Sequence, residues 1–168
     1  MRWEKIGKVF DPSENKLLLG CSLFAKGPQA MVMDDYVRVY FSACKQDTCG
    51  KYLSHICYVD FSRDFRKLFD ISRKEVIPLG ELGCFDEHGL FPIHIFRDGH
   101  EVWAYTTGWS RRVSVSADAS IGLAVSTDGG QSFRKVGNGP ILSSRLNEPF
   151  LIGDPFVLKV DGIYNMWY

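Results

Sequence analysis

Three carboxylates stand at positions where they could perform acid–base chemistry. Asp86 lies in the loop-like stretch CFDEHG, Glu148 precedes Pro149, and Asp154 precedes Pro155 at the start of an apolar run. Cleavage of a glycosidic bond needs one protonated and one ionised carboxyl group, about 5 to 5.5 Å apart for retention and about 6.5 to 9.5 Å apart for inversion. The three residues could therefore support glycoside hydrolysis, provided that the fold brings them together.

Each carboxylate also has a structural interpretation. Asp86 is a candidate base or nucleophile, or one residue of a solvated acidic loop. Glu148 is a candidate general acid or an exposed loop glutamate, and Asp154 is either functional or a turn and cap residue. A general acid needs a raised pKa, which burial or a neighbouring carboxylate supplies. The sequence alone does not reveal either environment.

Four further residues are suited to binding a sugar. His88 could hold a sugar hydroxyl group, and Trp109, Arg111 and Arg112 follow the second apolar run of the same segment. An aromatic face can stack on a sugar ring, and a guanidinium can form paired hydrogen bonds with a carboxylate or phosphate. The alternative is a surface loop with a packed tryptophan.

A repeated phrase indicates which elements position these side chains. PQAMVMDDYVRVYF, PIHIFRDGHEVWAY and PFVLKVDGIYNMWY each hold an aspartate between two apolar runs, and these aspartates, Asp35, Asp98 and Asp161, are 63 residues apart both times. Each phrase predicts a hairpin of two buried strands with a turn at the aspartate. Asp154 has no such counterpart, because the equivalent positions hold Gly27 and Phe91. The fold therefore does not require an aspartate there.

A second phrase extends each repeat to four strands. YVDFSRDFRKL matches STDGGQSFRKV, which places Asp60 on Asp128 and Phe65 on Phe133. The second copy also fits the Asp-box pattern of sialidase-like propellers, a structural turn motif formed here by Ser126, Asp128, Gly130 and Phe133. Four-stranded units of about 40 to 65 residues indicate an all-β fold, a β-propeller of antiparallel blades. A β-sandwich is the alternative, although it gives no reason for the constant spacing.

The expected organisation is one propeller domain that is incomplete. Residues 1–20 are assigned to the outer strand of the closing blade and a linker, 21–80 to blade one, 81–147 to blade two and 148–168 to the first hairpin of blade three. The outer strand is assigned because Trp3–Gly7 resembles Phe133–Gly137. About two and a third blades are then present, whereas propellers typically close with four to eight. We expect a front half of a longer protein, arising by truncation, by proteolysis or as a chain that a partner completes.

Composition excludes several classes of partner. The 168 residues are 45% hydrophobic, and 20 basic residues balance 20 acidic ones. A net charge of zero argues against nucleic acid and anionic lipid, and no stretch has the length of a signal peptide or membrane span. The five cysteines form no CxxC pair. We expect a cytoplasmic protein with free thiols, no metal site and no cofactor.

The motifs resemble a known superfamily. CFDEHGLFPIHIFRDGHEVWAYTTGW and GDPFVLKVDGIYNMWY resemble the five-bladed β-propeller glycosidases of glycoside hydrolase families 32, 43, 68 and 130, over residues 20–168 and most strongly from Cys84 onward. The resemblance implies an axial funnel with acidic residues at its mouth, and it likens Asp154 to the Asp-Pro stabiliser of family 32. FAKGPQAM lacks the first acid that families 32 and 43 usually carry, and Asp11 comes too early to replace it.

Three functions remain open at this point. The first is a glycoside hydrolase or phosphorylase that uses Asp86, Asp154 and Glu148 on an oligosaccharide or glycoconjugate, with this chain alone incomplete and inactive. The second is a carbohydrate-binding or scaffold propeller without catalysis. The third is a fragment with no activity of its own, which self-associates through open blade edges.

Overall fold

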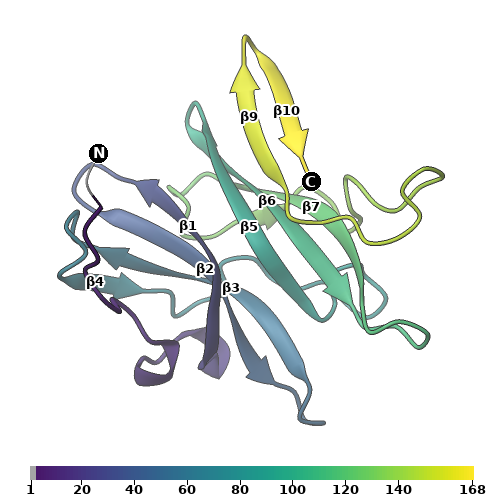
Figure 1. Ribbon diagram of the computed structural model, residues 1–168, viewed down its shortest axis with the longest axis horizontal. Coiled ribbons are helices and arrows are strands. Elements are labelled where there is room, and N and C mark those ends of the chain that lie inside the picture. The colour runs from purple at the N-terminus through teal and green to yellow at the C-terminus, as the bar shows by residue number, and fades with distance from the viewer. Residues whose placement is uncertain (1–2) are drawn as a thin grey trace.

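The computed structural model describes residues 3–168, which form a nearly all-β structure of two four-stranded units and one hairpin (Figure 1). The first unit holds β1 (Leu23–Val32), β2 (Val37–Gln46), β3 (Tyr52–Phe61) and β4 (Leu68–Ile71). The second holds β5 (Gly89–Asp98), β6 (Glu101–Ser110), β7 (Asp118–Ser126) and β8 (Arg134–Lys135). The hairpin is β9 (Phe156–Val160) with β10 (Ile163–Trp167). Short 3₁₀ turns at Pro12–Glu14 and Leu18–Gly20 precede β1. The predicted all-β fold and its four-stranded repeat are confirmed.

Local sequence explains the hairpins. The strands are rich in β-branched and aromatic residues, and their pairing within each unit is antiparallel throughout. The turn between β9 and β10 consists of Asp161 and Gly162, with φ of 50° and 79°. Two successive positive φ values characterise the tight turn that matches the twist of paired strands, and aspartate and glycine tolerate them best. Asp35 and Asp161 lie between paired strands as predicted, whereas Asp98 is the last residue of β5, paired with Glu101, and the turn consists of Gly99 and His100.

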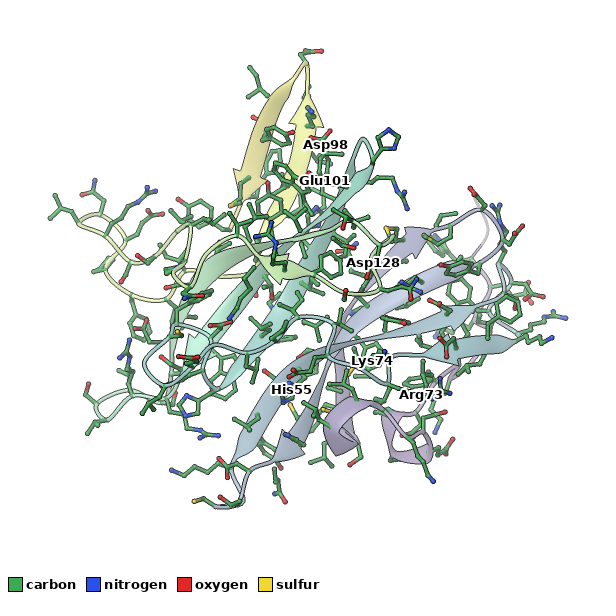
Figure 2. All side chains as sticks on the ribbon, turned by 180° about the vertical axis from the view of Figure 1, so that it is seen from behind. His55, Arg73, Lys74, Asp98, Glu101 and Asp128 are labelled. Atoms are coloured by element: carbon green, nitrogen blue, oxygen red, sulfur yellow. The ribbon has the colours of Figure 1, made fainter. Side chains whose placement is uncertain are left out.

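The first strands of the units lie next to one another. β1 contacts β5, and β5 contacts β9. The two four-stranded sheets are joined by a single parallel pair, Ser54 with Gly89. The β9–β10 hairpin projects from this arrangement and is tied to it through Asp98, which accepts hydrogen bonds from Lys159, at 3.0 Å, and from Tyr164 (Figure 2). The strand starts of successive units therefore gather at one end of the molecule.

The core fills the space between the two sheets. Tyr40 on β2 is fully buried, packs edge-on against Phe133 at 6.0 Å between ring centroids, and donates to the carbonyl of Gly130 at 2.6 Å. The turn between β7 and β8 thus docks onto the first unit. Within that turn Asp128 accepts from Ser126 and Ser132, both at 2.6 Å, which confirms the predicted Asp-box. Burial alone would raise the pKa of Asp128, but these bonds lower it to about 2.

The sequence alignment of the second phrase was wrong by four residues. Ser62 donates to Asp64 at 2.6 Å, just as Ser126 donates to Asp128 in the second unit. Asp64 also accepts a hydrogen bond from the main-chain N–H of Arg66. Asp64, not Asp60, is therefore the counterpart of Asp128. Asp60 lies inside β3 in a buried ion pair with Arg38.

The amino-terminal segment is extended. Trp3–Gly7 forms no strand, so the expected outer strand of a closing blade stays a prediction. Among residues 3–168 we find no helix with the length and apolar character needed to cross a bilayer.

Candidate functional site

An aromatic cleft lies at the end of the molecule where the strand starts gather. It has a volume of about 380 Å³ and is walled by strands of both units and by Leu151. Its lining includes four aromatic rings and one charged side chain: Phe24, Tyr52, Phe91 and Trp109, with Lys26. Clefts of this size that combine apolar walls with few polar groups are typical ligand sites.

Trp109 is fixed in orientation within the cleft. Its indole N–H donates to Ser54 at 2.7 Å, and its ring stacks on His88 at 5.9 Å and 26°. A Cβ on Gly89 would come within 2.3 Å of the indole nitrogen, so only glycine allows this approach. The structure thus brings His88 and Trp109 together, although the sequence placed them in two separate loops, and Trp109 lies within β6 and not in a loop.

Arg111 completes this group, whereas Arg112 does not. The main-chain N–H of Arg111 donates to Nδ1 of His88 at 3.3 Å, and its guanidinium pairs with Asp47 at 3.2 Å. Burial, with Arg111 nearby, lowers the pKa of His88, so that the ring is neutral and can accept at Nδ1. Arg112 instead pairs with Asp118 at 2.7 Å, across its own loop, and is not among the residues that wall the cleft.

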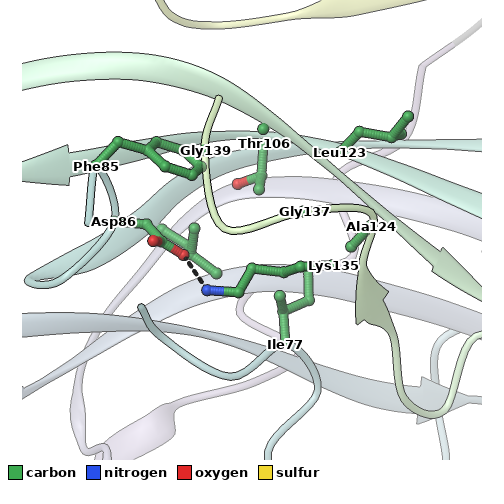
Figure 3. A pocket seen from close by; sticks show the side chains of 11 residues that line it. Ile77, Phe85, Asp86, Thr106, Leu123, Ala124, Lys135, Gly137 and Gly139 are labelled. Atoms are coloured by element: carbon green, nitrogen blue, oxygen red, sulfur yellow. Dashed lines mark hydrogen bonds and ion pairs between the residues drawn. The ribbon is translucent and has the colours of Figure 1, made fainter. Parts of the chain in front are cut away.

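Asp86 is buried beneath the second sheet. Its side chain is 0% exposed and pairs with Lys135 at 2.9 Å (Figure 3). The cavity beside it holds about 10 Å³, which is room for about one water molecule and not for a sugar ring. Its second oxygen, Oδ1, has no hydrogen-bond partner in the described structure.

Glu148 lies in the connection that leads to β9. It forms an ion pair with Arg145, which also donates to the hydroxyl of Tyr168 at 2.7 Å. Hydrogen bonds from Arg145 and Tyr168 lower the pKa of Glu148. This shift favours the ionised form, whereas a general acid must hold a proton near neutral pH.

Asp154 lies beside the cleft. Its main-chain N–H donates to Thr107, a wall residue, at 2.8 Å, and Gly153 packs against the same side chain. Asp154 is exposed, and its carboxylate makes no hydrogen bond with residues 3–168. Its φ of 54° is uncommon for a residue other than glycine. Aspartate tolerates this conformation, as it does at the turn residue Asp161, so what distinguishes Asp154 from Asp86 and Glu148 is its carboxylate beside the cleft, which is unpaired among residues 3–168.

The three predicted carboxylates occupy separate environments. Asp86 pairs with Lys135 and Glu148 with Arg145, and no hydrogen bond joins any two of the three within the described part of the chain. The same residues, 3–168, contain no group of three or more His, Cys, Asp or Glu side chains arranged to hold a metal ion.

Sequence reasoning missed most of the cleft wall. Phe24, Lys26, Tyr52 and Phe91 were not selected, although Phe91 stands before Pro92 as Asp154 stands before Pro155. The repeat therefore contained the signal, since the residues before each proline share one end of the fold.

Comparison with known proteins agrees with this architecture. No protein-family model matches the sequence. Uncharacterized proteins from two Mycobacterium tuberculosis strains are 30% identical over all 168 residues, and the chain spans about half, 54%, of their length. Among solved structures, a family 117 glycoside hydrolase from Zobellia galactanivorans has a TM-score of 0.60 at 15% identity, with 83% of this chain and 41% of that chain covered.

Two further structures belong to family 43. A β-xylosidase/α-arabinofuranosidase from a compost microbial metagenome, solved with xylotriose, has a TM-score of 0.56 at 19% identity and covers 86% of this chain and 42% of its own. A Xanthomonas citri enzyme, also solved with xylotriose, has the same TM-score at 18% identity, over 86% of this chain and 39% of its own. These neighbours are five-bladed β-propeller enzymes. The chain therefore has the propeller fold of these glycoside hydrolases.

Proposed function

We propose that the protein containing this chain acts on glycosidic bonds of an oligosaccharide or glycoconjugate, with Asp154 as an active-site carboxylate. The strongest support is the position of Asp154, because Thr107 holds its main chain at the cleft wall while its carboxylate remains free among residues 3–168. The fold adds support for a carbohydrate ligand, since two structural neighbours were solved with xylotriose.

In this proposal the cleft binds the sugar and Asp154 acts on it. Trp109 offers a fixed aromatic face for stacking, and Asp154 accepts hydrogen bonds from sugar hydroxyls that strengthen in the transition state. His88 holds the indole in place and Arg111 holds His88. We assign Asp86 a positioning role through Lys135 rather than contact with the sugar. Catalysis needs a second carboxylate, which we assign to the part of the whole protein beyond this chain.

Binding without catalysis is the second candidate function. It is favoured by one observation, which is that the walls of the cleft include a lysine and no carboxylate. Such a protein would retain a glycan on Trp109 without cleaving it.

Asp154→Asn in the whole protein is expected to lower glycan turnover by at least about 100-fold, because the amide removes the charge while keeping the shape. Asparagine also tolerates a positive φ, so the free energy of unfolding should change by less than about 0.5 kcal/mol. The measurement is release of reducing sugar, or of sugar phosphate when phosphate is supplied, from an oligosaccharide panel.

Two variants control this experiment. Asp161→Asn changes an aspartate of similar φ at the exposed hairpin tip, and it should leave turnover intact. Asp128→Ala removes the turn bonds from Ser126 and Ser132, and it should lower the free energy of unfolding by about 1 kcal/mol. Equal turnover of wild type and Asp154→Asn would remove Asp154 from the catalytic residues.

We also propose that the 168-residue chain self-associates through the β9–β10 hairpin. Three of its apolar residues are more than half exposed, with Val160 at 52%, Ile163 at 66% and Trp167 at 56%. A glutamate in place of Ile163 should shift the chain toward the monomer at high concentration, because a charge in an apolar interface is costly. Sedimentation velocity measures this change. A monomeric wild-type chain at high concentration contradicts the proposal.

A further inference from the structure

Lys26 is the charged residue of the cleft that the proposed function leaves unused. It lies on β1, half-buried, with its ammonium 4.6 Å from the centre of the Phe91 ring and 5.4 Å from that of Phe24. No described carboxylate lies within ion-pairing distance of it in residues 3–168. The aromatic faces stabilise the ammonium, yet a ring face cannot replace an anion as a hydrogen-bond acceptor.

The surroundings of Lys26 leave its charge uncompensated. The walls of the cleft contain no aspartate or glutamate. Cys44 also lines the cleft, and burial raises the pKa of its thiol, so that it remains neutral at physiological pH. Arg111, which holds His88 behind Trp109, already has Asp47 as its partner. The walls of the cleft therefore carry one positive charge and no negative one, while the carboxylate of Asp154 lies beside them.

A neutral ligand would fit this cleft poorly. A sugar stacked on the aromatic wall would cover the ammonium, and a buried charge without a partner costs free energy. A ligand with an acidic group would instead form a charge-assisted hydrogen bond, which is about twice as strong as a neutral one. Lys26 thus disfavours neutral glycans and favours acidic ones.

We propose that the cleft selects an acidic sugar, whose ring stacks on Trp109 and whose carboxylate, sulfate or phosphate group pairs with Lys26. This inference rests on the proposed function, and it names the substrate class of that site. A carboxylate, a sulfate and a phosphate share the chemistry that matters, which is anionic oxygen atoms able to accept from an ammonium group.

The test is calorimetric titration of the whole protein with matched pairs of oligosaccharides. Each pair consists of an acidic sugar and its neutral parent: tetragalacturonate with carboxyl-reduced tetragalacturonate, a sulfated with a desulfated galactose oligomer, and a phosphorylated with a dephosphorylated mannose oligomer. We expect at least one acidic member to bind about 10-fold or more tightly than its parent. Lys26→Gln should remove this preference by weakening binding of the acidic member and strengthening binding of the neutral parent, whereas Lys26→Arg should retain it.

Lys74→Gln is the matched control, because Lys74 is exposed, forms no ion pair in the described structure and lies on the connection after β4 (Figure 2). It should bind as wild type does. Equal affinity for both members of every pair, or an acid preference that survives Lys26→Gln, overturns the proposal. Inorganic phosphate that binds alone as tightly as the phosphorylated oligomer would also overturn it, by assigning Lys26 to free phosphate. If the wild-type protein bound none of the oligosaccharides, acidic or neutral, that result would instead contradict the proposed function itself.

Discussion

Asp60→Ala is expected to lower the free energy of unfolding by about 3 to 5 kcal/mol, because it leaves a buried guanidinium without its counter-charge. Asp60 and Arg38 face each other across β3 and β2 and form two hydrogen bonds, at 2.8 and 2.7 Å. Their side chains are 9% and 4% exposed. Urea denaturation of the variant and the wild type measures the difference.

The loss of stability in Asp60→Ala is large because Arg38 stays protonated and therefore remains a buried, unpaired positive charge. Burial alone would lower the pKa of Arg38, but the ion pair with Asp60 raises it above the usual range of arginine. The guanidinium also lies 3.9 Å from the centre of the Tyr58 ring, which holds it in place. Its Nη1 already lacks a hydrogen-bond partner in the described structure, so no spare acceptor can replace Asp60.

Two variants show whether pairing is the cause. Asp64→Ala removes the exposed turn aspartate four residues away and should cost only about 1 kcal/mol. The double variant Arg38→Met with Asp60→Leu removes both charges, and it should be more stable than Asp60→Ala alone. A loss of less than about 1 kcal/mol for Asp60→Ala would mean that the pair contributes little.

The hairpins could be predicted because their signals are local. Apolar runs and a turn at an aspartate are recognised from adjacent residues alone. Three copies of the same phrase at a constant spacing supported the same prediction. The role of Asp60 could not be predicted in the same way. Its partner Arg38 is 22 residues earlier on the neighbouring strand, and only the register of β2 and β3 brings them together. Aligning the phrases by letters alone placed Asp60 in a turn.

The candidate site was predictable to a similar extent. His88, Trp109 and Arg111 could be selected by residue type, and they meet in space because the start of β5 and the end of β6 lie at one end of their hairpin. The environments of the carboxylates depend instead on distant residues. Asp86 meets Lys135, which is 49 residues later, and the sequence has no local sign of this pair.

Asp86→Asn is expected to lower the free energy of unfolding by about 3 kcal/mol, because it breaks the buried ion pair with Lys135. The value is at the low end for a broken buried ion pair, since Lys135 is 18% exposed and can regain some contact with water. The cavity of about 10 Å³ offers little room for rearrangement. Thermal and urea unfolding measure the change.

A double-mutant cycle separates structural from catalytic roles for Asp86. Lys135→Met alone leaves a carboxylate that is 0% exposed without its partner, so it should cost at least as much as Asp86→Asn. The double variant should cost less than the sum of the two single variants, because each single variant leaves one unpaired charge and the double variant leaves none. If Asp86 were instead the nucleophile, Asp86→Asn would abolish turnover while stability stayed near wild type. A sugar could reach it only if the segment Gly83–His88 moved, since Phe85 now packs directly on Gly108 and Gly122.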